Sequence, residues 1–202
     1  MSENYRIKYK VSNSEDNNSI LPNILNLNKE SDIEKSEFEG FLRSERIMTE
    51  TLSRETEFNN KYIKSIHYYA LYHLYSFAGN YRSVNMSKDG FYFPPAKFVP
   101  ESMHSFEKNI LYNLPETYQN KEDLIKNIAL VHSELLFIHP FREGNGRTSR
   151  ILANMMSYKA GYNRLRFEEI TKKNNFDKYV SAVQKAGMKK YSYMEEIIQE
   201  IF

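Results

Sequence analysis

Helical periodicity constrains the fold of this 202-residue chain more than any other feature. From Ser31 onward, apolar residues recur three and four positions apart, the spacing of one face of an amphipathic helix. Ser31 is a suitable N-cap, with Glu34 three residues later as in a capping box. Phe38, Phe41 and Leu42 follow as an apolar stripe. The pattern predicts a helix that begins near Ser31.

The same periodicity recurs in six later segments: 60–77, 103–114, 121–138, 148–159, 176–190 and 191–202. Each is long enough for a helix of a globular protein, and Gly161 ends the fourth of them. The sequence therefore predicts an all-α domain over residues 31–202, built as a bundle of helices.

One β-hairpin is predicted within this helical pattern. Short β-prone runs lie on either side of Lys88-Asp89-Gly90, and an Asp-Gly pair favours a tight hairpin turn. Pro94 and Pro95 end the second run, because proline cannot donate to a strand ladder. We expect the hairpin to be inserted between two helices.

Residues 1–29 are rich in Asn and Ser, unlike the rest of the chain. We therefore assign residues 1–30 to a separate segment. Their small apolar patch consists of Ile20, Leu21, Ile24 and Leu25. We expect an N-terminal arm that is ordered only where this patch docks on the domain.

Composition excludes several classes of function. The formal net charge is +2, which does not indicate a general nucleic-acid or membrane binder. Cysteine is absent, which excludes disulfides and zinc–thiolate sites and suits a reducing cytoplasm. No apolar run approaches the ~20 residues of a membrane span, and the polar start is not a signal peptide. We expect a cytoplasmic protein.

The stretch HPFREGNGRTSR, residues 139–150, has the features of an anion site. Pro140 disfavours helical geometry at His139, so the preceding helix should end there. Gly144 and Gly146 let the backbone turn tightly and approach a ligand closely. A helix follows directly, and the N–H groups and dipole at a helix start attract anions.

The charged residues of this stretch fit phosphate chemistry. Arg147 and Arg150 are three residues apart, so both guanidinium groups lie on one side of the first helical turn. Glu143 would repel phosphates unless Mg²⁺ lay between them, and Mg²⁺ is commonly held by one or two carboxylates plus phosphate oxygens. His139 titrates near neutrality and can accept a proton from a hydroxyl. The set predicts transfer of part of a nucleoside triphosphate to a hydroxyl.

Each of these residues also has an ordinary interpretation. A histidine before proline is commonly a capping or packing residue, a Gly-Asn-Gly run is commonly a turn, and arginines three apart are commonly a solvated helix face. These interpretations give no reason for a base, an acid, two glycines and two arginines to converge at one helix start. The phosphate site is therefore the preferred hypothesis.

The pattern His139-Pro140-Phe141-x-Glu143-Gly144-Asn145-Gly146-Arg147-x-x-Arg150 resembles the signature of the Fic (filamentation induced by cAMP) family. Upstream residues that share the resemblance are Ile66-His67, Leu74-Tyr75, Phe77-Ala78-Gly79, Tyr81-Arg82, Asn85, Ser87-Lys88 and Gly90-Phe91. The likeness extends over roughly residues 34–202. It implies a mostly helical Fic fold with a hairpin flap over the active site. It also implies transfer of AMP from ATP to a Ser, Thr or Tyr hydroxyl of a target protein.

The resemblance implies a role for each signature residue. By this resemblance, His139 would be the general base, Phe141 would anchor the loop in the core, and Glu143 would bind Mg²⁺. The backbone of Gly144 and Gly146 would form the anion hole. Asn145 would contact the α-phosphate, Arg147 the β-phosphate and Arg150 the γ-phosphate. The flap would add a strand of the target protein, with little reading of its sequence. Its residues are Val84, Asn85, Met86, Ser87, Lys88, Asp89, Gly90 and Phe91. Tyr179 either packs on the adenine or simply fills the core, and His67, His73, His104 and His132 are interpreted as packing or surface residues.

Other activities remain open within this resemblance. A kinase-like branch replaces the second signature glycine with a basic residue, whereas this chain has Gly146, which favours AMP transfer. Branches that transfer UMP, GMP or phosphocholine share the signature loop. A catalytically silent nucleotide-binding or interaction module is the alternative of another class.

Regulation is less well defined. Many Fic proteins carry an inhibitory helix with the pattern Ser/Thr-x-x-x-Glu-Gly/Asn, whose glutamate pairs with the second signature arginine, here Arg150. Glu39-Gly40 has the Glu-Gly pair with Ser36 out of register, and Ser192-x-x-x-Glu196 has the spacing but lacks the Gly or Asn. Glu39 and Glu196 are the candidate inhibitory acids. Since neither segment matches fully, we expect a separate antitoxin-like inhibitor, as in toxin–antitoxin pairs.

Overall fold

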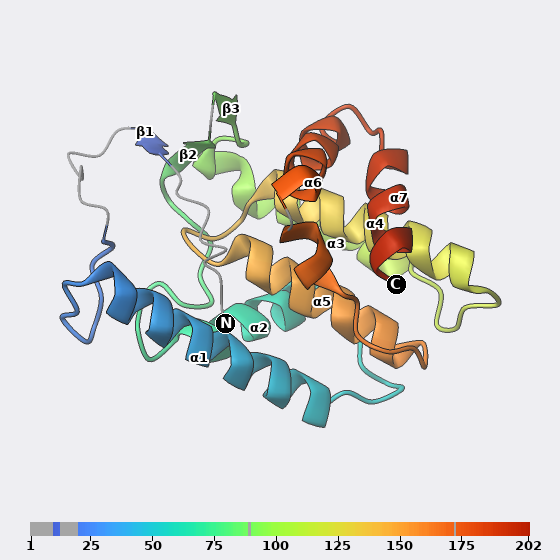
Figure 1. Cartoon of the computed structure of the whole chain (residues 1–202), viewed down its shortest axis with the longest axis horizontal. Helices are drawn as coiled ribbons and strands as arrows, with labels where there is room; N and C mark the ends of the chain where they lie inside the picture. Colours follow the sequence, from blue (N-terminus) through green and yellow to red (C-terminus); the bar gives the residue numbers. More distant parts are fainter. Residues whose placement is uncertain (1–9, 13–19, 89, 172) are drawn as a thin grey trace.

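The computed structural model describes residues 10–12, 20–88, 90–171 and 173–202. The helices in this part of the chain are α1 Glu30–Glu50, α2 Asn60–Leu71, α3 Val99–Asn109, α4 Lys121–Ile138, α5 Asn145–Lys159, α6 Lys173–Ala186 and α7 Ser192–Ile201. The strands are β1 Lys10–Ser12, β2 Asn85–Lys88 and β3 Phe91–Tyr92, and the 3₁₀ turns are η1 Ala96–Phe98, η2 Leu111–Asn113 and η3 Phe167–Thr171. The predicted all-α class with one inserted hairpin is confirmed (Figure 1).

The helix α4 is the centre of the bundle. It packs against α3, α5, α6 and α7, and most of its residues are buried, as are most of those of α5. A helix that is apolar on most sides belongs in the interior, and the run of apolar residues in 124–138 explains this position. The loop between α4 and α5 is therefore carried by the two most buried helices.

The helix α1 crosses α2 at a close contact. Gly40 lies there, and a Cβ on it would be 1.9 Å from the carbonyl oxygen of Ala70. Glycine at this position thus follows from helix packing, because only a residue without a side chain permits the approach. The contact also fixes how α1 is rotated, so that Glu37, Phe41 and Ser44 face inward.

Several helix boundaries differ from the sequence prediction: α3 covers Val99–Asn109 instead of 103–114, α5 begins at Asn145 instead of 148, and α6 covers Lys173–Ala186 instead of 176–190. The helix α1 begins at Glu30 with Lys29 at the N-cap, so Ser31 lies inside the first turn and is not the cap. The helix α2 ends at Leu71, well before the predicted residue 77. It stops early because the chain turns back at Gly79, which has a φ of +77° and whose N–H donates to His67 Nδ1 over 2.8 Å.

The flap is part of a three-stranded antiparallel sheet with the order β1-β2-β3. In the hairpin, Ser87 pairs with Tyr92 and Lys88 with Phe91. The arm contributes β1, which pairs with the other edge of β2 and had not been predicted. Of the apolar patch in the arm, Ile20 and Leu21 pack against the core, whereas Ile24 and Leu25 are exposed.

Within the described part of the chain, none of the helices is both long and apolar enough to cross a membrane.

Candidate active site

The loop from α4 to α5 begins with His139 in an unusual backbone conformation. His139 caps α4 with a φ of +53°, in the left-handed region that residues with a side chain seldom adopt. Its Nδ1 lies 3.1 Å from the carbonyl oxygen of Leu136, a hydrogen bond that requires a proton on Nδ1. The lone pair of the neutral ring is therefore on Nε2.

His139 is 2 % exposed, and this burial governs its charge. Burial lowers the pKa of His139 to about 3, while the hydrogen bond to Leu136 acts in the opposite direction. The positive charges of Arg82 and Lys88 lower the pKa further. His139 is thus neutral near pH 7, which is the state that a general base requires.

Three side chains hold the loop in shape. The Asn145 amide accepts a hydrogen bond from the N–H of Phe141 at 2.8 Å and donates one to its carbonyl oxygen at 2.7 Å. Phe141 is fully buried, as expected for a core anchor, and stacks on the ring of His67 with centroids 3.9 Å apart. His67 Nε2 in turn donates to the carbonyl oxygen of Glu143 over 3.0 Å, because its Nδ1 already accepts from Gly79.

The helix α5 starts at Asn145, directly after Gly144. Gly144 has a φ of +77°, and a Cβ there would lie 2.8 Å from the ring of Phe41. Gly146 is different, because its φ is ordinary and a Cβ would meet no atom within 4 Å. Packing therefore requires glycine at 144 but not at 146. An open helix start at Gly146, with N–H groups that have no partner inside the helix, is what close approach of an anion requires.

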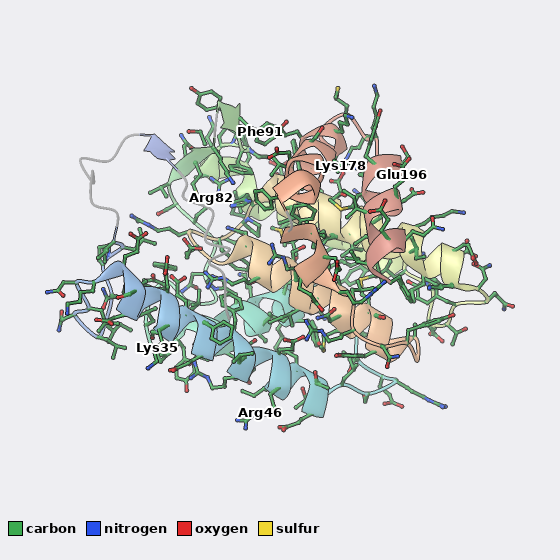
Figure 2. The ribbon with its side chains drawn as sticks, viewed as in Figure 1. Lys35, Arg46, Arg82, Phe91, Lys178 and Glu196 are labelled. Atoms are coloured by element: carbon green, nitrogen blue, oxygen red, sulfur yellow. The ribbon has the colours of Figure 1, made fainter. Side chains whose placement is uncertain are left out.

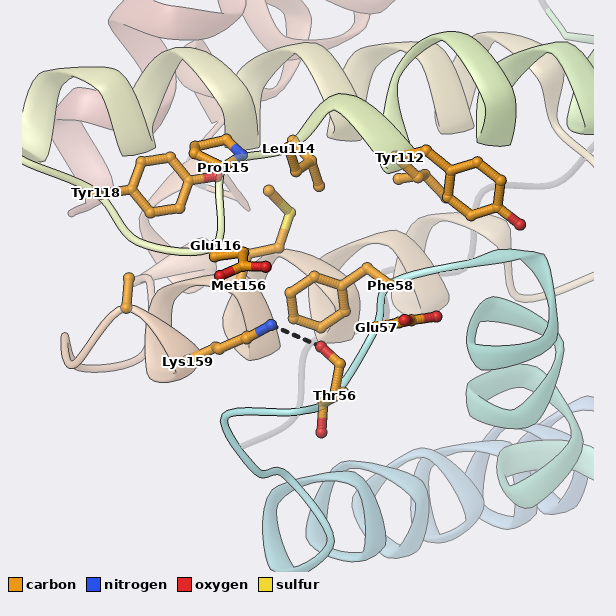
Figure 3. A pocket seen from close by; sticks show the side chains of 12 residues that line it. Thr56, Glu57, Phe58, Tyr112, Leu114, Pro115, Glu116, Tyr118, Met156 and Lys159 are labelled. Atoms are coloured by element: carbon orange, nitrogen blue, oxygen red, sulfur yellow. Dashed lines mark hydrogen bonds between the residues drawn. The ribbon is translucent and has the colours of Figure 1, made fainter.

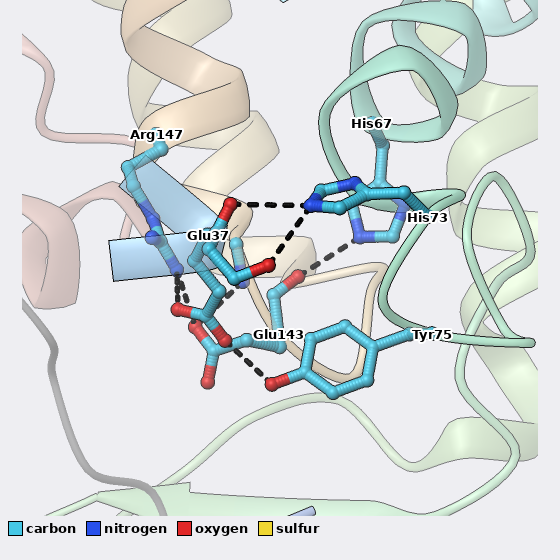
Figure 4. A network of polar contacts seen from close by, with 8 residues as sticks. Glu37, His67, His73, Tyr75, Glu143 and Arg147 are labelled. Carbon is cyan, nitrogen blue, oxygen red and sulfur yellow. Dashed lines mark hydrogen bonds and ion pairs between the residues drawn. The ribbon is translucent and has the colours of Figure 1, made fainter. Parts of the chain in front are cut away.

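Arg147 joins a network of buried acids (Figure 4). Its guanidinium lies 2.7 Å from Oε2 of Glu37 on α1 and 3.2 Å from Oε1 of Glu143. The Glu37 side chain is only 1 % exposed, and its other oxygen accepts a 2.6 Å hydrogen bond from the Tyr75 hydroxyl. Glu37 is thus a buried carboxylate whose charge is balanced by a signature arginine.

A small cavity of about 70 Å³ opens beside this loop and contains its chemical groups. The residues that line it are Lys88, Phe91, Phe93, Leu136, His139, Gly146, Arg150, Tyr179, Val180, Val183 and Gln184. His139, Gly146 and Arg150 come from the signature loop, Lys88 and Phe91 from the flap, and the rest mainly from α6. One cavity thus brings together three elements that are distant in sequence.

A larger cavity of about 470 Å³ lies elsewhere (Figure 3). It is lined partly by Met156 and Lys159 near the end of α5, which is about 20 Å from the start of that helix. Lys159 there donates to the carbonyl oxygen of Thr56. The small cavity is the candidate active site, because it holds the base, the open glycine and an arginine, whereas the larger one holds none of them.

The flap lies directly over His139. Phe93, just after β3, stacks on the imidazole with ring centroids 3.9 Å apart. Lys88 lies over the ring of Phe176, so the flap also contacts α6, the helix that supplies four of the residues lining the cavity. Met86 is buried and serves packing, while Asp89 lies outside the described residues.

Arg82 connects the flap to the signature loop and is 4 % exposed (Figure 2). Its guanidinium donates to the carbonyl oxygens of His139, Val84 and Pro94 over 2.6–2.8 Å. Its own N–H donates to Pro140 over 2.8 Å. One side chain thus ties both ends of the flap to the residue that would act as base.

The sequence identified the loop but not the side chains around it. Glu37, Arg82, His67 and His132 all contact it or its arginines, and the two histidines had been interpreted only as packing or surface residues. His67 and Arg82 belong to the upstream segment that shares the resemblance, which was the available signal. Glu37 had no such signal.

The two candidate inhibitory acids are both exposed. Glu39 lies on the outer face of α1, and Glu196 lies on α7, away from α1 (Figure 2). On α1, Glu37 contacts a signature arginine, Arg147.

In the described residues, no cluster of three or more His, Cys, Asp or Glu side chains is suited to hold a metal ion. Glu143 fits Mg²⁺, because it is a buried carboxylate beside the start of α5 and Mg²⁺ commonly takes its other ligands from phosphates and water.

Known proteins resemble this chain in sequence and in structure. A sequence model of the Fic/DOC family matches residues 57–157, which is half of the chain. The protein adenylyltransferase Fic of Nematostella vectensis is 35% identical over 85 residues, covering 42% of this chain and 19% of that protein. The protein adenylyltransferase Fic of Drosophila willistoni is 29% identical over 144 residues, covering 71% of this chain and 28% of that protein. The chain therefore spans less than a third of the length of these relatives.

Solved structures show the same fold. The N-terminal FIC domain of the Bep8 effector from Bartonella sp. 1-1C superposes with a TM-score of 0.76 at 18% identity, covering 92% of each chain. The BepC effector of Bartonella tribocorum, with bound AMPPNP, gives a TM-score of 0.73 at 18% identity, covering 92% of this chain and 93% of that one. The matched family segment includes the flap, Arg82 and every signature residue, and we conclude that this chain belongs to the Fic/DOC family.

Proposed function

We propose that this protein transfers AMP from ATP to a Ser, Thr or Tyr hydroxyl of a target protein. The observation that carries the proposal is the position of a buried His139 beside the start of α5, where Gly146 leaves open space next to the backbone. The names of the curated relatives and the AMPPNP in a structural neighbour support the same activity.

The nucleotide would lie in the small cavity and along the start of α5. The free N–H groups of the first turn would bind the α-phosphate, with the second Nδ2 hydrogen of Asn145 as a further donor. Arg147 would bind the β-phosphate and Arg150 the γ-phosphate, where forked guanidinium groups are most effective. The adenine would enter between Val180, Val183 and Tyr179, which form the apolar wall of the cavity.

Glu143 is the residue that we propose to hold Mg²⁺. When bound there, Mg²⁺ would neutralise phosphate charge and orient the triphosphate.

His139 would act as the general base. Its Nε2 would take the proton of the target hydroxyl while the oxygen bonds to the α-phosphorus, and the bond from that phosphorus to the bridging oxygen of the β-phosphate would break. The products are the AMP-modified protein and pyrophosphate. The hydrogen bond from Nδ1 to Leu136 fixes the tautomer, and the stacked ring of Phe93 fixes the orientation of the imidazole.

The target would reach this site along the flap. The order β1-β2-β3 makes β1 and β3 the two edge strands of the sheet, so a target strand would add to β3 or replace β1. Main-chain pairing reads little sequence, and the hydroxyl that projects over His139 would be chosen mainly by its position.

Control of the activity would act at Arg147. In the described structure Glu37 holds this guanidinium, so ATP must displace Glu37 to use it. We propose that an activating event separates the two, and a separate antitoxin-like protein remains the candidate for keeping them together. Glu39 and Glu196 are exposed and would act only through such a partner.

Residues 31–202 would make up the Fic domain, with residues 1–30 as its N-terminal arm. The protein would act in the cytoplasm, where ATP is supplied.

The test is incubation of the protein with labelled ATP and Mg²⁺ in a cell lysate, followed by mass spectrometry of the labelled proteins. The expected result is a mass increase equal to one AMP, lost in His139→Ala, with ATP binding retained in that variant. A mass increase equal to UMP, GMP, phosphocholine or phosphate would replace AMP as the transferred group. Equal labelling by the wild-type protein and His139→Ala would refute the mechanism.

A further inference from the structure

The N-terminal arm occupies one edge of the flap. Its strand β1 pairs antiparallel with β2, and the paired residues are Lys10 with Ser87, Val11 with Met86 and Ser12 with Asn85. In Figure 1, β1 lies beside β2, on the side of β2 that faces away from β3. A segment from the start of the chain thus lies on the flap along which a target protein would reach His139.

The backbone groups of β2 that face β1 can be identified from the hairpin. The N–H of Phe93 donates to the carbonyl oxygen of Met86 over 3.1 Å, so the backbone groups of Met86 face β3. In an antiparallel ladder, both backbone groups of a residue point to the same neighbouring strand, and successive residues alternate between the two neighbours. The N–H and C=O groups of Asn85 and Ser87 therefore face the opposite edge of β2, which β1 occupies.

The same alternation separates two kinds of residue within β1. Lys10 and Ser12 lie opposite the two residues of β2 whose backbone groups face them, so their own N–H and C=O groups form the ladder. Val11 lies between them, opposite Met86, and its backbone groups point away from β2. The pairing of β1 with β2 therefore depends on the backbone of Lys10 and Ser12 and not on that of Val11.

The other edge of the flap, along β3, offers less to a target strand. Tyr92 lies opposite Ser87, whose backbone groups face β1, so the backbone groups of Tyr92 point outward. The next residue that would face outward is Pro94, which has no N–H and whose carbonyl oxygen accepts from Arg82 over 2.6 Å. Between Phe91 and Pro94, the outer edge of β3 thus presents one residue with an N–H, whereas the outer edge of β2 presents two.

We propose that an extended segment of the target protein pairs with the outer edge of β2, and that the arm competes with the target for this edge. Main-chain pairing reads little sequence, so β1 and a target segment can use the same N–H and C=O groups of β2. The inference rests on the proposed function, because it assumes a target that pairs with the flap.

The covalent link makes the arm an effective competitor. Residues 13–19 join β1 to Ile20, which packs against the core, and the N–H of Ile24 donates to the carbonyl oxygen of Leu74 over 2.9 Å. A short tether of this kind gives an effective concentration of roughly millimolar order. A target protein at a lower concentration must therefore displace β1 from β2 before its hydroxyl can be modified.

A purely structural role of β1 would have a different effect on the kinetics. If β1 supports the flap in the working enzyme, weaker pairing should lower kcat or raise KM for the target protein. If β1 competes with the target, weaker pairing should lower KM and leave kcat unchanged, because a saturating target displaces the arm in either case.

The experiment compares proline variants of β1 in the full chain. Ser12→Pro removes an N–H that pairs with β2, and Lys10→Pro does the same at the other end of the strand. Val11→Pro is the matched control, because an edge strand tolerates proline where the N–H faces away from the ladder. Thermal unfolding checks that the three variants are folded.

The measured quantity is the initial rate of labelling of a purified target, taken from the lysate experiment, over a range of target concentrations at saturating ATP and Mg²⁺. One hydrogen bond changes an equilibrium by roughly 2- to 10-fold. We therefore expect KM for the target to fall by about that factor in Ser12→Pro and in Lys10→Pro, with kcat unchanged. Val11→Pro should keep the KM of the wild-type chain.

The possible outcomes separate the inference from the proposed function. An unchanged or raised KM in Ser12→Pro and Lys10→Pro, with the target still labelled, would overturn the inference and leave the proposed function standing. An equal fall of KM in Val11→Pro would also overturn it, because pairing with β2 would not explain that result. Labelling by Ser12→Pro and Lys10→Pro alone would support competition most directly. If neither the wild-type chain nor any variant labels a protein, the proposed function fails and the inference fails with it.

Discussion

Replacing Glu37 by glutamine is the perturbation that most directly tests how this site is controlled. The variant keeps the size of the side chain and an acceptor for the Tyr75 hydroxyl, but it removes the charge that holds Arg147 at 2.7 Å. Arg147 would retain its weaker contact with Glu143 at 3.2 Å. The guanidinium should therefore become available to a phosphate without losing its place.

The expected magnitude follows from the bond that ATP must replace. A hydrogen bond between charged groups contributes about 1.5–3 kcal/mol, which corresponds to about 10- to 100-fold in an equilibrium constant. If Arg147 binds ATP only when it is separated from Glu37, the observed affinity is reduced by the fraction of molecules in which the two are apart. Glu37→Gln should thus bind ATP about 10- to 100-fold more tightly and label its target faster at limiting ATP.

Calorimetry with ATP and Mg²⁺ measures the affinity, and thermal unfolding checks that the variant is folded. Glu39→Gln is the matched control, because it removes the same charge from the exposed face of the same helix. Unchanged or weaker ATP binding in a folded Glu37→Gln would refute the reasoning, and would mean that Glu37 orients Arg147 for the nucleotide. Tighter binding in Glu39→Gln alone would instead support the acid that the sequence pattern indicated.

Further predictions follow from single contacts. Gly144→Ala should lower the melting temperature strongly, because Gly144 has a φ of +77° and the added Cβ would lie 2.8 Å from Phe41. Gly146→Ala should leave the melting temperature nearly unchanged and weaken ATP binding. Equal melting temperatures for the two variants would contradict this prediction. In Arg82→Lys, the lysine cannot donate to three carbonyl oxygens in the geometry of the guanidinium group. The variant should therefore lower kcat/KM for the target protein by about tenfold or more, with a smaller effect on ATP affinity. An unchanged kcat/KM would show that the flap does not depend on these hydrogen bonds. Acidification should destabilise the fold, because burial lowers the pKa values of His67, His132 and His139 from 6.5 to about 3 and the unfolded chain then takes up protons first. The contribution of these three histidines to the free energy of unfolding is fully present above pH 6.5 and is lost as the pH falls toward 3, by about 4 kcal/mol per pH unit. Urea unfolding at pH 7.5 and at pH 5.5 measures the change. Equal free energies of unfolding at the two pH values would be inconsistent with three neutral buried rings. Chelation of Mg²⁺ should abolish labelling, and Glu143→Gln should raise the Mg²⁺ concentration required for half-maximal labelling.

Much of the fold was accessible from the sequence because helix periodicity is local. The periodicity of residues 121–138 predicted the helix α4 with its observed end, since Pro140 restricts His139 directly. The end of α2 was predicted wrongly, because it depends on the hydrogen bond between Gly79 and His67, a contact made only once the chain has folded back. Local rules extend the helix through residue 77, and a tertiary contact stops it at Leu71.

The signature loop and its chemistry were also determined by the sequence itself, because its base, acid, glycines and arginines lie within twelve consecutive residues and one turn of helix brings them together. The residues that hold and oppose this loop were decided only by the tertiary structure. Glu37 is 110 residues away from Arg147, and it faces the loop because the contact of Gly40 with Ala70 fixes the rotation of α1. A helix turns by about 100° per residue, so the rotation that buries Glu37 directs Glu39, two residues on, to solvent. A sequence pattern reports which acids are present on α1, whereas the packing of two helices decides which of them reaches the phosphate site.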